Sequence, residues 1–229
     1  MNAPSAPLRP AAVALLALGL AAARPAAALE PYVATGFPFA LAGVAQPLGE
    51  SFAVRADVGT IARRAYSGST SDNDFRGRVA YDRLALVGDW FVAGGGFRLS
   101  AGATINQAKA TLTASSHDGK ITIGGNTYDA PSALYYVQSE LSFPKAAPYV
   151  GIGWGHHDSA PGLTFNVDLG ASIGTARATP LKPSPALAAE LALDRQGQSD
   201  LAQENRDFQD TVHRLKALPQ LTLGMGYRF

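Results

Sequence analysis

The sequence predicts an all-β fold, a small antiparallel transmembrane β-barrel of about eight strands with an α-helical insertion before the last strand. From Leu221 to Phe229 every odd position is a large apolar residue and every even position is polar or small, which gives an extended strand one apolar face. The same alternation recurs along the chain, which has 24 glycines and only 16% charged residues. Beyond the N-terminus no apolar run reaches the roughly 18 residues of a spanning helix, so a membrane-spanning chain must close into a barrel.

The N-terminal segment is interpreted as a secretory signal peptide. Arg9 is the single charge before an apolar run from Ala11 to Ala23, and the small residues Ala26 to Ala28 follow as a cleavage site. We therefore expect residues 1–28 to be removed and residues 29–229 to form the barrel. Removal of Arg9 and Arg24 leaves 17 of the 19 basic residues against 18 acidic ones, a net charge of −1. Without a basic patch or stripe, nucleic acid is not an expected partner.

The remaining chain divides into eight segments with strand-like alternation, each of about the 9–11 residues or more that a transmembrane strand needs. The segments are residues 32–45, 51–66, 77–92, 97–113, 132–143, 148–155, 163–175 and 218–229. With a periplasmic C-terminus, the long loops 67–76 and 114–131 fall on the side where turns are normally short. An alternative remains open, in which residues 132–155 are one long strand and another strand is missed.

The insertion, residues 178–217, separates the last two strands and has helical character. Ser184-Pro185 is typical of a helix start, and Gly197 is expected to weaken or kink the helix. Apolar residues then follow at helical spacing, and we expect them to pack on the barrel rim: Leu201, Phe208, Val212 and Leu215. The pattern leaves open whether the insertion lies outside the bilayer or inside the lumen.

The C-terminal half resembles a known class of membrane proteins. It contains Ala147-Pro-Tyr-Val-Gly-Ile-Gly-Trp-Gly155, Val167-Asp-Leu-Gly170 and an ending that begins at Leu218-Pro219 and closes on Gly-Tyr-Arg-Phe229. This order is similar to that of small eight-stranded outer-membrane proteins of Gram-negative bacteria, of the carbapenem-associated, ornithine-linked type, and more distantly to the OmpA transmembrane domain. The resemblance implies a bacterial outer-membrane location, contact with outer-membrane lipid and lipopolysaccharide, and insertion by the barrel-assembly machinery. It also implies an assembly signal formed by Leu221, Leu223, Tyr227 and Phe229.

Charged residues of both signs are predicted on the inward faces of the strands. The expected lumen set is Arg55, Asp57, Arg83, Asp89, Arg98, Glu140, Asp168 and Arg228. An eight-stranded barrel is just wide enough for its own side chains to fill it, and unpaired buried charges cost several kcal/mol each. One interpretation is therefore a paired network that plugs the lumen, and the other is a narrow polar path for cationic solutes.

Aromatic residues gather near the predicted strand ends, as in the interface girdles of membrane barrels. They are Trp90, Phe91, Phe97, Tyr149, Trp154, Phe165, Tyr227 and Phe229. A ligand-stacking role is the weaker interpretation of this set.

The cluster His156-His157-Asp158-Ser159 is the single candidate for catalysis. His157 and Ser159 have the His-x-Ser spacing of outer-membrane lipid A deacylases, in which a histidine activates a serine nucleophile. However, Ser159-Ala-Pro-Gly162 is also typical of a turn, and two histidines without a third ligand are weak evidence for a metal. We therefore expect no enzyme, no cofactor and no metal. The favoured function is a structural or surface outer-membrane protein with limited permeation of small cationic solutes, and the alternative is a selective uptake channel for basic amino acids.

Overall fold

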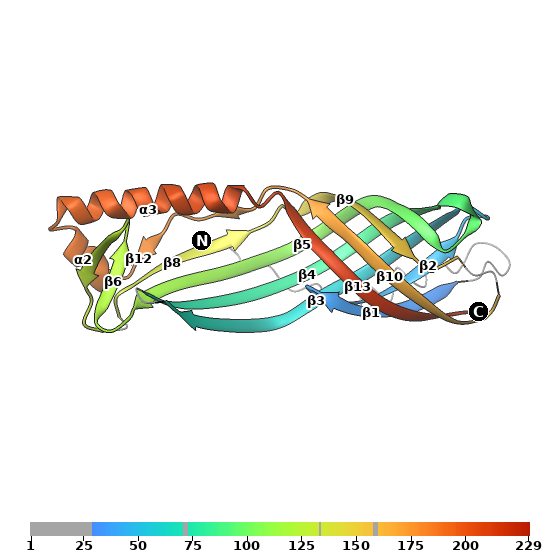
Figure 1. Cartoon of the computed structure of the whole chain (residues 1–229), viewed down its shortest axis with the longest axis horizontal. Helices are drawn as coiled ribbons and strands as arrows, with labels where there is room; N and C mark the ends of the chain where they lie inside the picture. Colours follow the sequence, from blue (N-terminus) through green and yellow to red (C-terminus); the bar gives the residue numbers. More distant parts are fainter. Residues whose placement is uncertain (1–28, 71–72, 133, 158–159) are drawn as a thin grey trace, which may run out of the picture.

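The structure is a computed structural model that describes residues 29–70, 73–132, 134–157 and 160–229. The signal peptide predicted for residues 1–28 lies outside the described residues. Figure 1 shows an elongated molecule with a barrel of tilted strands at one end and a long helix lying along the other. None of the helices in the described ranges is long and apolar enough to span a bilayer.

Eight antiparallel strands close into a ring and confirm the predicted fold class. In ring order β1 pairs with β2, β2 with β3, β3 with β4, β4 with β5, β5 with β9, β9 with β10 and β10 with β13, and β13 pairs back with β1. The ring strands are β1 (Glu30–Phe37), β2 (Ala40–Pro47), β3 (Phe52–Ser69), β4 (Asn73–Phe91), β5 (Phe97–Ser116), β9 (Ala146–Trp154), β10 (Gly162–Ile173) and β13 (Ala217–Arg228).

The predicted strand numbering is wrong in two places, although the count of eight is right. Residues 32–45 form two strands, because the chain reverses at Pro38 and Thr35 of β1 lies opposite Ala40 of β2. Residues 132–155 instead form one interrupted strand: β8 (Tyr136–Ser142) and β9 both run antiparallel to β5 and follow each other along it. The alternative left open by the sequence, one long strand and one missed strand, is therefore the observed arrangement.

This correction places the long connections together at one end of the molecule. We call the end with Leu29 and Phe229 the near end, where the Phe229 amide donates to the Leu29 carbonyl at 3.4 Å. The short connections 48–51 and 92–96, which include η1 (Val92–Gly94), also lie there. Residues 117–135 and the helical insertion lie at the opposite, far end (Figure 1).

The far half is built on strands that continue beyond the ring. β3, β4 and β5 are 18, 19 and 20 residues long, and β8 pairs with the outer part of β5. The remaining elements are the hairpin β6 (Lys120–Ile123) and β7 (Asn126–Asp129), the short strands β11 (Arg177–Ala178) and β12 (Lys182–Pro183) on β8, and the helices α2 (Pro185–Leu191) and α3 (Arg195–His213).

The two helices begin at side-chain caps. The Ser184 hydroxyl accepts from the Leu187 amide at 3.3 Å, as expected from Ser184-Pro185. The Asp194 carboxylate accepts from the Gln196 and Gly197 amides at 2.9 and 3.1 Å. Each cap satisfies amide groups that the first turn leaves unpaired. Gly197 belongs to this first turn, and α3 continues through it without interruption to His213.

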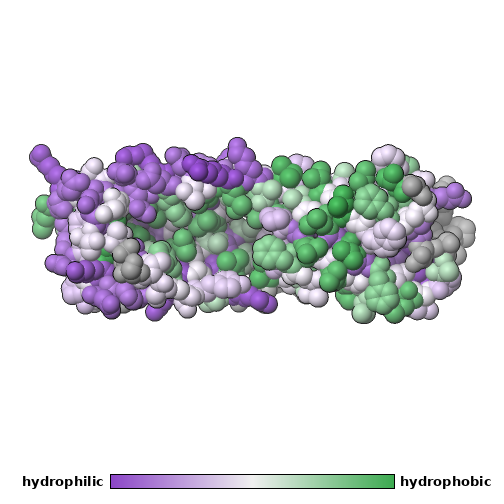
Figure 2. All heavy atoms as spheres, in the orientation of Figure 1, coloured by the Kyte–Doolittle hydropathy of each residue, from purple (hydrophilic) through white to green (hydrophobic). Residues whose placement is uncertain are grey.

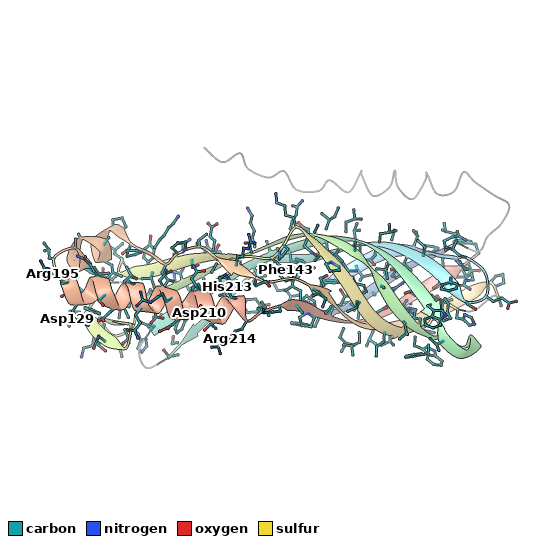
Figure 3. All side chains as sticks on the ribbon, turned by 90° about the horizontal axis from the view of Figure 1, so that it is seen from above. Asp129, Phe143, Arg195, Asp210, His213 and Arg214 are labelled. Carbon is teal, nitrogen blue, oxygen red and sulfur yellow. The ribbon has the colours of Figure 1, made fainter. Side chains whose placement is uncertain are left out.

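The apolar side of α3 packs on the inside of the far half. Val212 is buried with Phe143, and Phe208 packs against the same cluster. Phe143 lies beside the barrel-side end of α3, next to His213 (Figure 3). Leu201 packs instead against a second cluster with Ile121 and Leu187. Leu215 lies after the helix and is 45% exposed, so it does not belong to this apolar side.

The polarity of the two halves is inverted. In the ring, the exposed outer face is apolar, with Leu163, Phe165 and Leu223 each at least 60% exposed, and the inner face is polar. In the far half, Ile121 and Leu187 are fully buried inside and charged residues cover the outside. Figure 2 shows the corresponding change from a hydrophobic surface around the ring to a hydrophilic surface around α3. An apolar environment around the ring and water around the far half would suit this distribution.

Candidate functional site in the barrel interior

The barrel interior brings together most of the charged residues predicted to line it. Seven side chains from five strands lie inside the ring, each with 4% or less of the residue exposed. They are Arg55, Asp57, Arg83, Asp89, Arg98, Asp168 and Arg228. Together with Glu30 they form three groups at successive heights, and each group contains both signs of charge.

Glu140 is a correction to the predicted set. It is exposed on β8, opposite Thr111 of β5, and its neighbour Ser139 points inward instead. The reason is the inversion of polarity: β8 lies beyond the ring, where Val137 and Phe143 form the inner face and polar residues face outward. Glu140 alternates with the buried residues Val137 and Ser139 and therefore faces outward.

The central group joins four strands through two arginines and two aspartates. The Nε of Arg55 contacts Oδ2 of Asp89 at 2.5 Å, and its Nη2 lies 3.1 Å from Oδ1 of Asp168. The Nη2 of Arg98 donates to the same Asp168 oxygen at 2.7 Å. Ser100 donates its hydroxyl to Asp89 at 2.5 Å. Each carboxylate thus receives more than one donor, as a buried charge requires.

A second group lies toward the far half around Arg83. Its Nη2 donates to Oδ1 of Asp57 at 2.6 Å, and its Nη1 donates to the side chain of Gln220. The guanidinium carbon lies 4.9 Å from the ring centre of Phe39 and 5.5 Å from that of Tyr149. Gln220 in turn donates to the Tyr149 hydroxyl at 2.8 Å. Charge pairing and cation–π contact together hold this guanidinium across the lumen.

The third group lies at the near end and contains two residues that the sequence analysis did not place in the lumen. Glu30 Oε2 accepts from Arg228 Nη2 at 2.6 Å, and Oε1 contacts His156 Nδ1 and the Thr164 hydroxyl, both at 2.7 Å. Glu30 is fully buried and His156 is 1% exposed. Glu30 was missed because it precedes the predicted strand start, although the alternation Glu30, Tyr32, Ala34 continues its inward face.

Neutral polar residues occupy the lumen between these groups and the far half. The Tyr81 hydroxyl donates to Asn106 at 2.9 Å, and the hydroxyls of Thr104 and Ser172 lie 3.0 Å apart. All four residues have 4% or less of their surface exposed. With four arginines (55, 83, 98 and 228) and four acids (Glu30, Asp57, Asp89 and Asp168), the described interior is balanced in charge, and each of these residues is at most 4% exposed.

The predicted histidine cluster is divided by the structure. His156 belongs to the lumen group with Glu30. The ring of His157 instead lies 4.6 Å from that of Phe91. Asp158 and Ser159 lie outside the described residues, so the His157–Ser159 pair is not seen. Among the residues that the structure does describe, no three histidine or acidic side chains are arranged to hold a metal ion.

The aromatic residues and the C-terminal strand have mostly outward positions. Trp90, Phe97, Trp154 and Phe165 are 40–64% exposed, whereas Phe91 and Tyr149 are buried and do not belong to a surface girdle. The four residues of the proposed assembly signal, at positions 221, 223, 227 and 229, are 48–72% exposed on one face of the barrel's last segment. This face is the lipid-facing one in a membrane barrel.

Comparisons with known proteins support the fold. No protein-family model matches the sequence, and no curated protein matches it. Among solved structures, CarO of Acinetobacter baumannii matches with a TM-score of 0.59 at 12% identity, over 89% of this chain and 97% of that chain. CarO2 of Acinetobacter baumannii matches with a TM-score of 0.61 at 14% identity, over 90% and 100% of the two chains. The chain therefore shares the fold of these proteins, and the resemblance noted in its sequence is confirmed for the fold.

Proposed function

We propose that this protein is a structural and surface protein of the Gram-negative outer membrane, anchored by a barrel whose lumen is closed. The observation that carries the proposal is the combination of ion-paired side chains inside the barrel with a belt of exposed apolar residues on its outer surface. The belt supports a membrane location, because a large contiguous exposed apolar surface is rare on soluble proteins. Its members include Val33, Leu86, Leu99, Ile152, Leu163, Phe165, Leu169, Leu221, Leu223 and Met225.

The loop lengths support one orientation. Membrane barrels have short turns on the periplasmic side and long loops outside. The near end, with the short connections 48–51 and 92–96, is therefore assigned to the periplasm, and the far half with α3 to the cell exterior. In this orientation the protein displays a folded platform beyond the bilayer.

The buried charges of the lumen favour a closed membrane anchor rather than an open channel. Arg98 and Glu30 have no exposed surface, and Asp89 and Arg228 have 1%, so water does not reach these charges as it would in an open pore. Because arginines and acids are equal in number, the interior has no excess of negative charge to attract a basic amino acid. Limited permeation of small cationic solutes then requires movement of paired side chains.

Planar-bilayer conductance tests the closed lumen. We expect the folded protein to give no steps above the lipid background in the presence of lysine, arginine or potassium salts. The double variant Arg83→Ala/Tyr149→Ala is the positive control. It lacks two large side chains at one level of the lumen, and we expect it to conduct. Folding of each sample is checked by its heat-dependent shift in gel mobility. Regular steps from the unaltered protein would refute the closed lumen and favour the channel for basic amino acids.

Single cysteines test the orientation, since the chain has none of its own. Gln203→Cys lies on the exposed side of α3, and Glu50→Cys lies in an exposed near-end turn. In intact cells a membrane-impermeant maleimide should label position 203 and should label position 50 only after the outer membrane is permeabilised. The opposite pattern would place the far half in the periplasm.

A further inference from the structure

Basic side chains form a row on the outer surface just beyond the apolar belt. On β5 the last strongly exposed apolar residue is Ile105, at 52%, and the exposed Lys109 follows four residues later. Lys109 lies opposite Ser142 of β8, which lies opposite Arg177 of β11. Residues directly opposite in antiparallel strands share a face, so Lys109 and Arg177 both point outward, one on each side of β8.

Two further cations adjoin this pair. On β4, Arg78 is exposed two residues from Ala80, the partner of Lys109, and such diagonal neighbours lie about 7–8 Å apart. Lys145, also exposed, precedes Ala146, which lies opposite Ile105 at the rim of the belt. We call these four residues, Arg78, Lys109, Lys145 and Arg177, the cationic row.

The charges of the cationic row are not engaged by the protein. Among the described residues, none of the four side chains forms an ion pair or a hydrogen bond, whereas every arginine of the lumen does. The acids closest in strand register are Asp82 and Glu140, each two residues from a direct partner of Lys109, and neither makes an ion pair within the described ranges. Four positive charges against these two acids leave the row with a net positive charge.

The height of the row matches a lipid headgroup region. Four residues of strand measure about 13 Å, and a strand tilt of about 35–45° reduces this to about 10 Å above the belt. The polar zone of a bilayer extends roughly 5–8 Å beyond the hydrocarbon core on each side. Lys145, next to the partner of Ile105, lies within this zone. Lys109 starts just beyond it, and its long side chain can reach back into it. The proposed orientation, on which this inference rests, places the row on the outer side.

A polar hollow borders the row on the side away from the belt. Its volume is about 220 Å³, and its lining includes Gln138, Glu140, Thr179 and Lys182. Amides, hydroxyls and a carboxylate are suitable partners for the hydroxyl groups of a saccharide. Phosphate-binding cations and a sugar-sized polar hollow are thus adjacent.

We propose that the cationic row binds the phosphate groups of a phosphorylated saccharide lipid of the outer leaflet, with its sugar hydroxyls in the neighbouring hollow. Arginine and lysine form charge-assisted hydrogen bonds with phosphate, and each basic residue near an anionic surface contributes on the order of 1 kcal/mol. The site would fix the depth and the rotation of the barrel relative to the lipid around it.

Native mass spectrometry from neutral detergent micelles tests this site. The probes are a bisphosphorylated glucosamine-disaccharide lipid, its dephosphorylated form, phosphatidylglycerol and inorganic phosphate as competitor. The test variant is Arg78→Gln/Lys109→Gln/Arg177→Gln. The matched control is Lys120→Gln/Arg195→Gln/Arg206→Gln, which removes three exposed positive charges from the far half. Figure 3 shows Arg195 at the tip of the molecule, remote from the barrel.

We expect the phosphorylated glycolipid to bind at least ten-fold more weakly to the test variant and within two-fold of the unaltered protein to the control. Equal binding by all three proteins, or equal losses in both variants, would overturn the proposal. Full competition by millimolar inorganic phosphate would identify a free phosphate as the ligand. Equal binding of phosphatidylglycerol would show that the saccharide does not contribute to binding and would overturn that part of the proposal. Binding in micelles does not depend on the orientation of the protein in a cell membrane. Failure of this experiment is therefore distinct from failure of the cysteine-labelling experiment, which tests the orientation.

Discussion

Arg228 and Glu30, 198 positions apart in the sequence, form an ion pair inside the barrel, with Arg228 Nη2 at 2.6 Å from Glu30 Oε2. The pair joins β13 to β1, the two strands whose pairing completes the ring. Arg228 also donates to the His156 carbonyl at 2.9 Å, which adds the β9–β10 connection. One arginine thus fastens three segments at the near end.

Glu30→Ala should lower the free energy of unfolding by about 3–5 kcal/mol, because it leaves Arg228 buried without its partner. Urea titration in detergent micelles measures the change. Glu50→Ala, an exposed acid at the same end, is the control and should change the value by less than about 0.5 kcal/mol. Equal stability of both variants would show that the ion pair does not hold the seam.

Gly170→Ala should destabilise the barrel by about 1–3 kcal/mol through overpacking. A Cβ atom at this position would lie 2.6 Å from Cζ of Tyr149 and 2.8 Å from the carbonyl of Val150, so the tyrosine must move and its hydrogen bond with Gln220 is disturbed. Gly77→Ala is the matched change, because nothing lies within 4 Å of a Cβ there. The same urea titration compares them, and a larger loss for the control would contradict this reading of the lumen.

Leu187→Ala should loosen the helical insertion without opening the barrel. The side chain is 1% exposed among Ile121, Ile123 and Leu191, and such truncations cost about 2–5 kcal/mol. Faster proteolysis within α2 and α3 with an unchanged heat-dependent gel shift is the expected result. Leu193→Ala is the control, since Leu193 is 92% exposed. A barrel that opens together with the insertion would show that the two halves unfold as one unit.

The contact between α3 and the β6–β7 hairpin should weaken in acid. Hydrogen bonds donated by the Tyr128 hydroxyl and by Asn126 hold the pKa of Asp200 below its ordinary value, with a smaller contribution from Gln196. A group with a lowered folded-state pKa stabilises above its unfolded pKa, about 3.9, and that stabilisation is lost as the pH falls through the folded value. Proteolysis of the insertion by pepsin should therefore accelerate below about pH 4.

Asp200→Asn is the control for this pH dependence. The amide has nearly the shape of the carboxylate and does not titrate, so the acceleration attributed to Asp200 should be absent from the variant. The variant should also be cleaved faster than the unaltered protein by trypsin at pH 7, because the two donors lose an ionised acceptor. An identical acid profile in both proteins would assign the effect to other carboxylates.

The alternation of side chains predicted the ring but not its numbering. Residues 163–175 and 218–229 alternate without interruption, and they are found as β10 and β13. The reversal between β1 and β2 was missed because it occupies only Pro38 and Phe39, and the pattern on either side is apolar and small. A turn this short leaves no polar loop in the sequence, and only the pairing of Thr35 with Ala40 reveals it.

The lumen residues were predicted correctly within the ring, where charged side chains face inward, and incorrectly on the strand segment beyond the ring. Arg55, Asp89 and Asp168 were placed correctly because polar residues face inward within the ring. Glu140 was misplaced because β8 lies beyond the ring, where Val137 and Phe143 are buried inside and the charged Glu140 faces outward. The height at which a strand leaves the membrane depends on tertiary structure, so a single alternating pattern does not show on which side of that boundary a residue lies.

The β4–β5 ladder runs from Asn73 and Ser116 to Phe91 and Arg98 without a bulge, and so passes from one half of the molecule to the other. With 19 residues in β4, it is about 60 Å long. Strands bend most readily at β-bulges, and this ladder has none. We therefore expect the far half and the ring to tilt together as one stiff body.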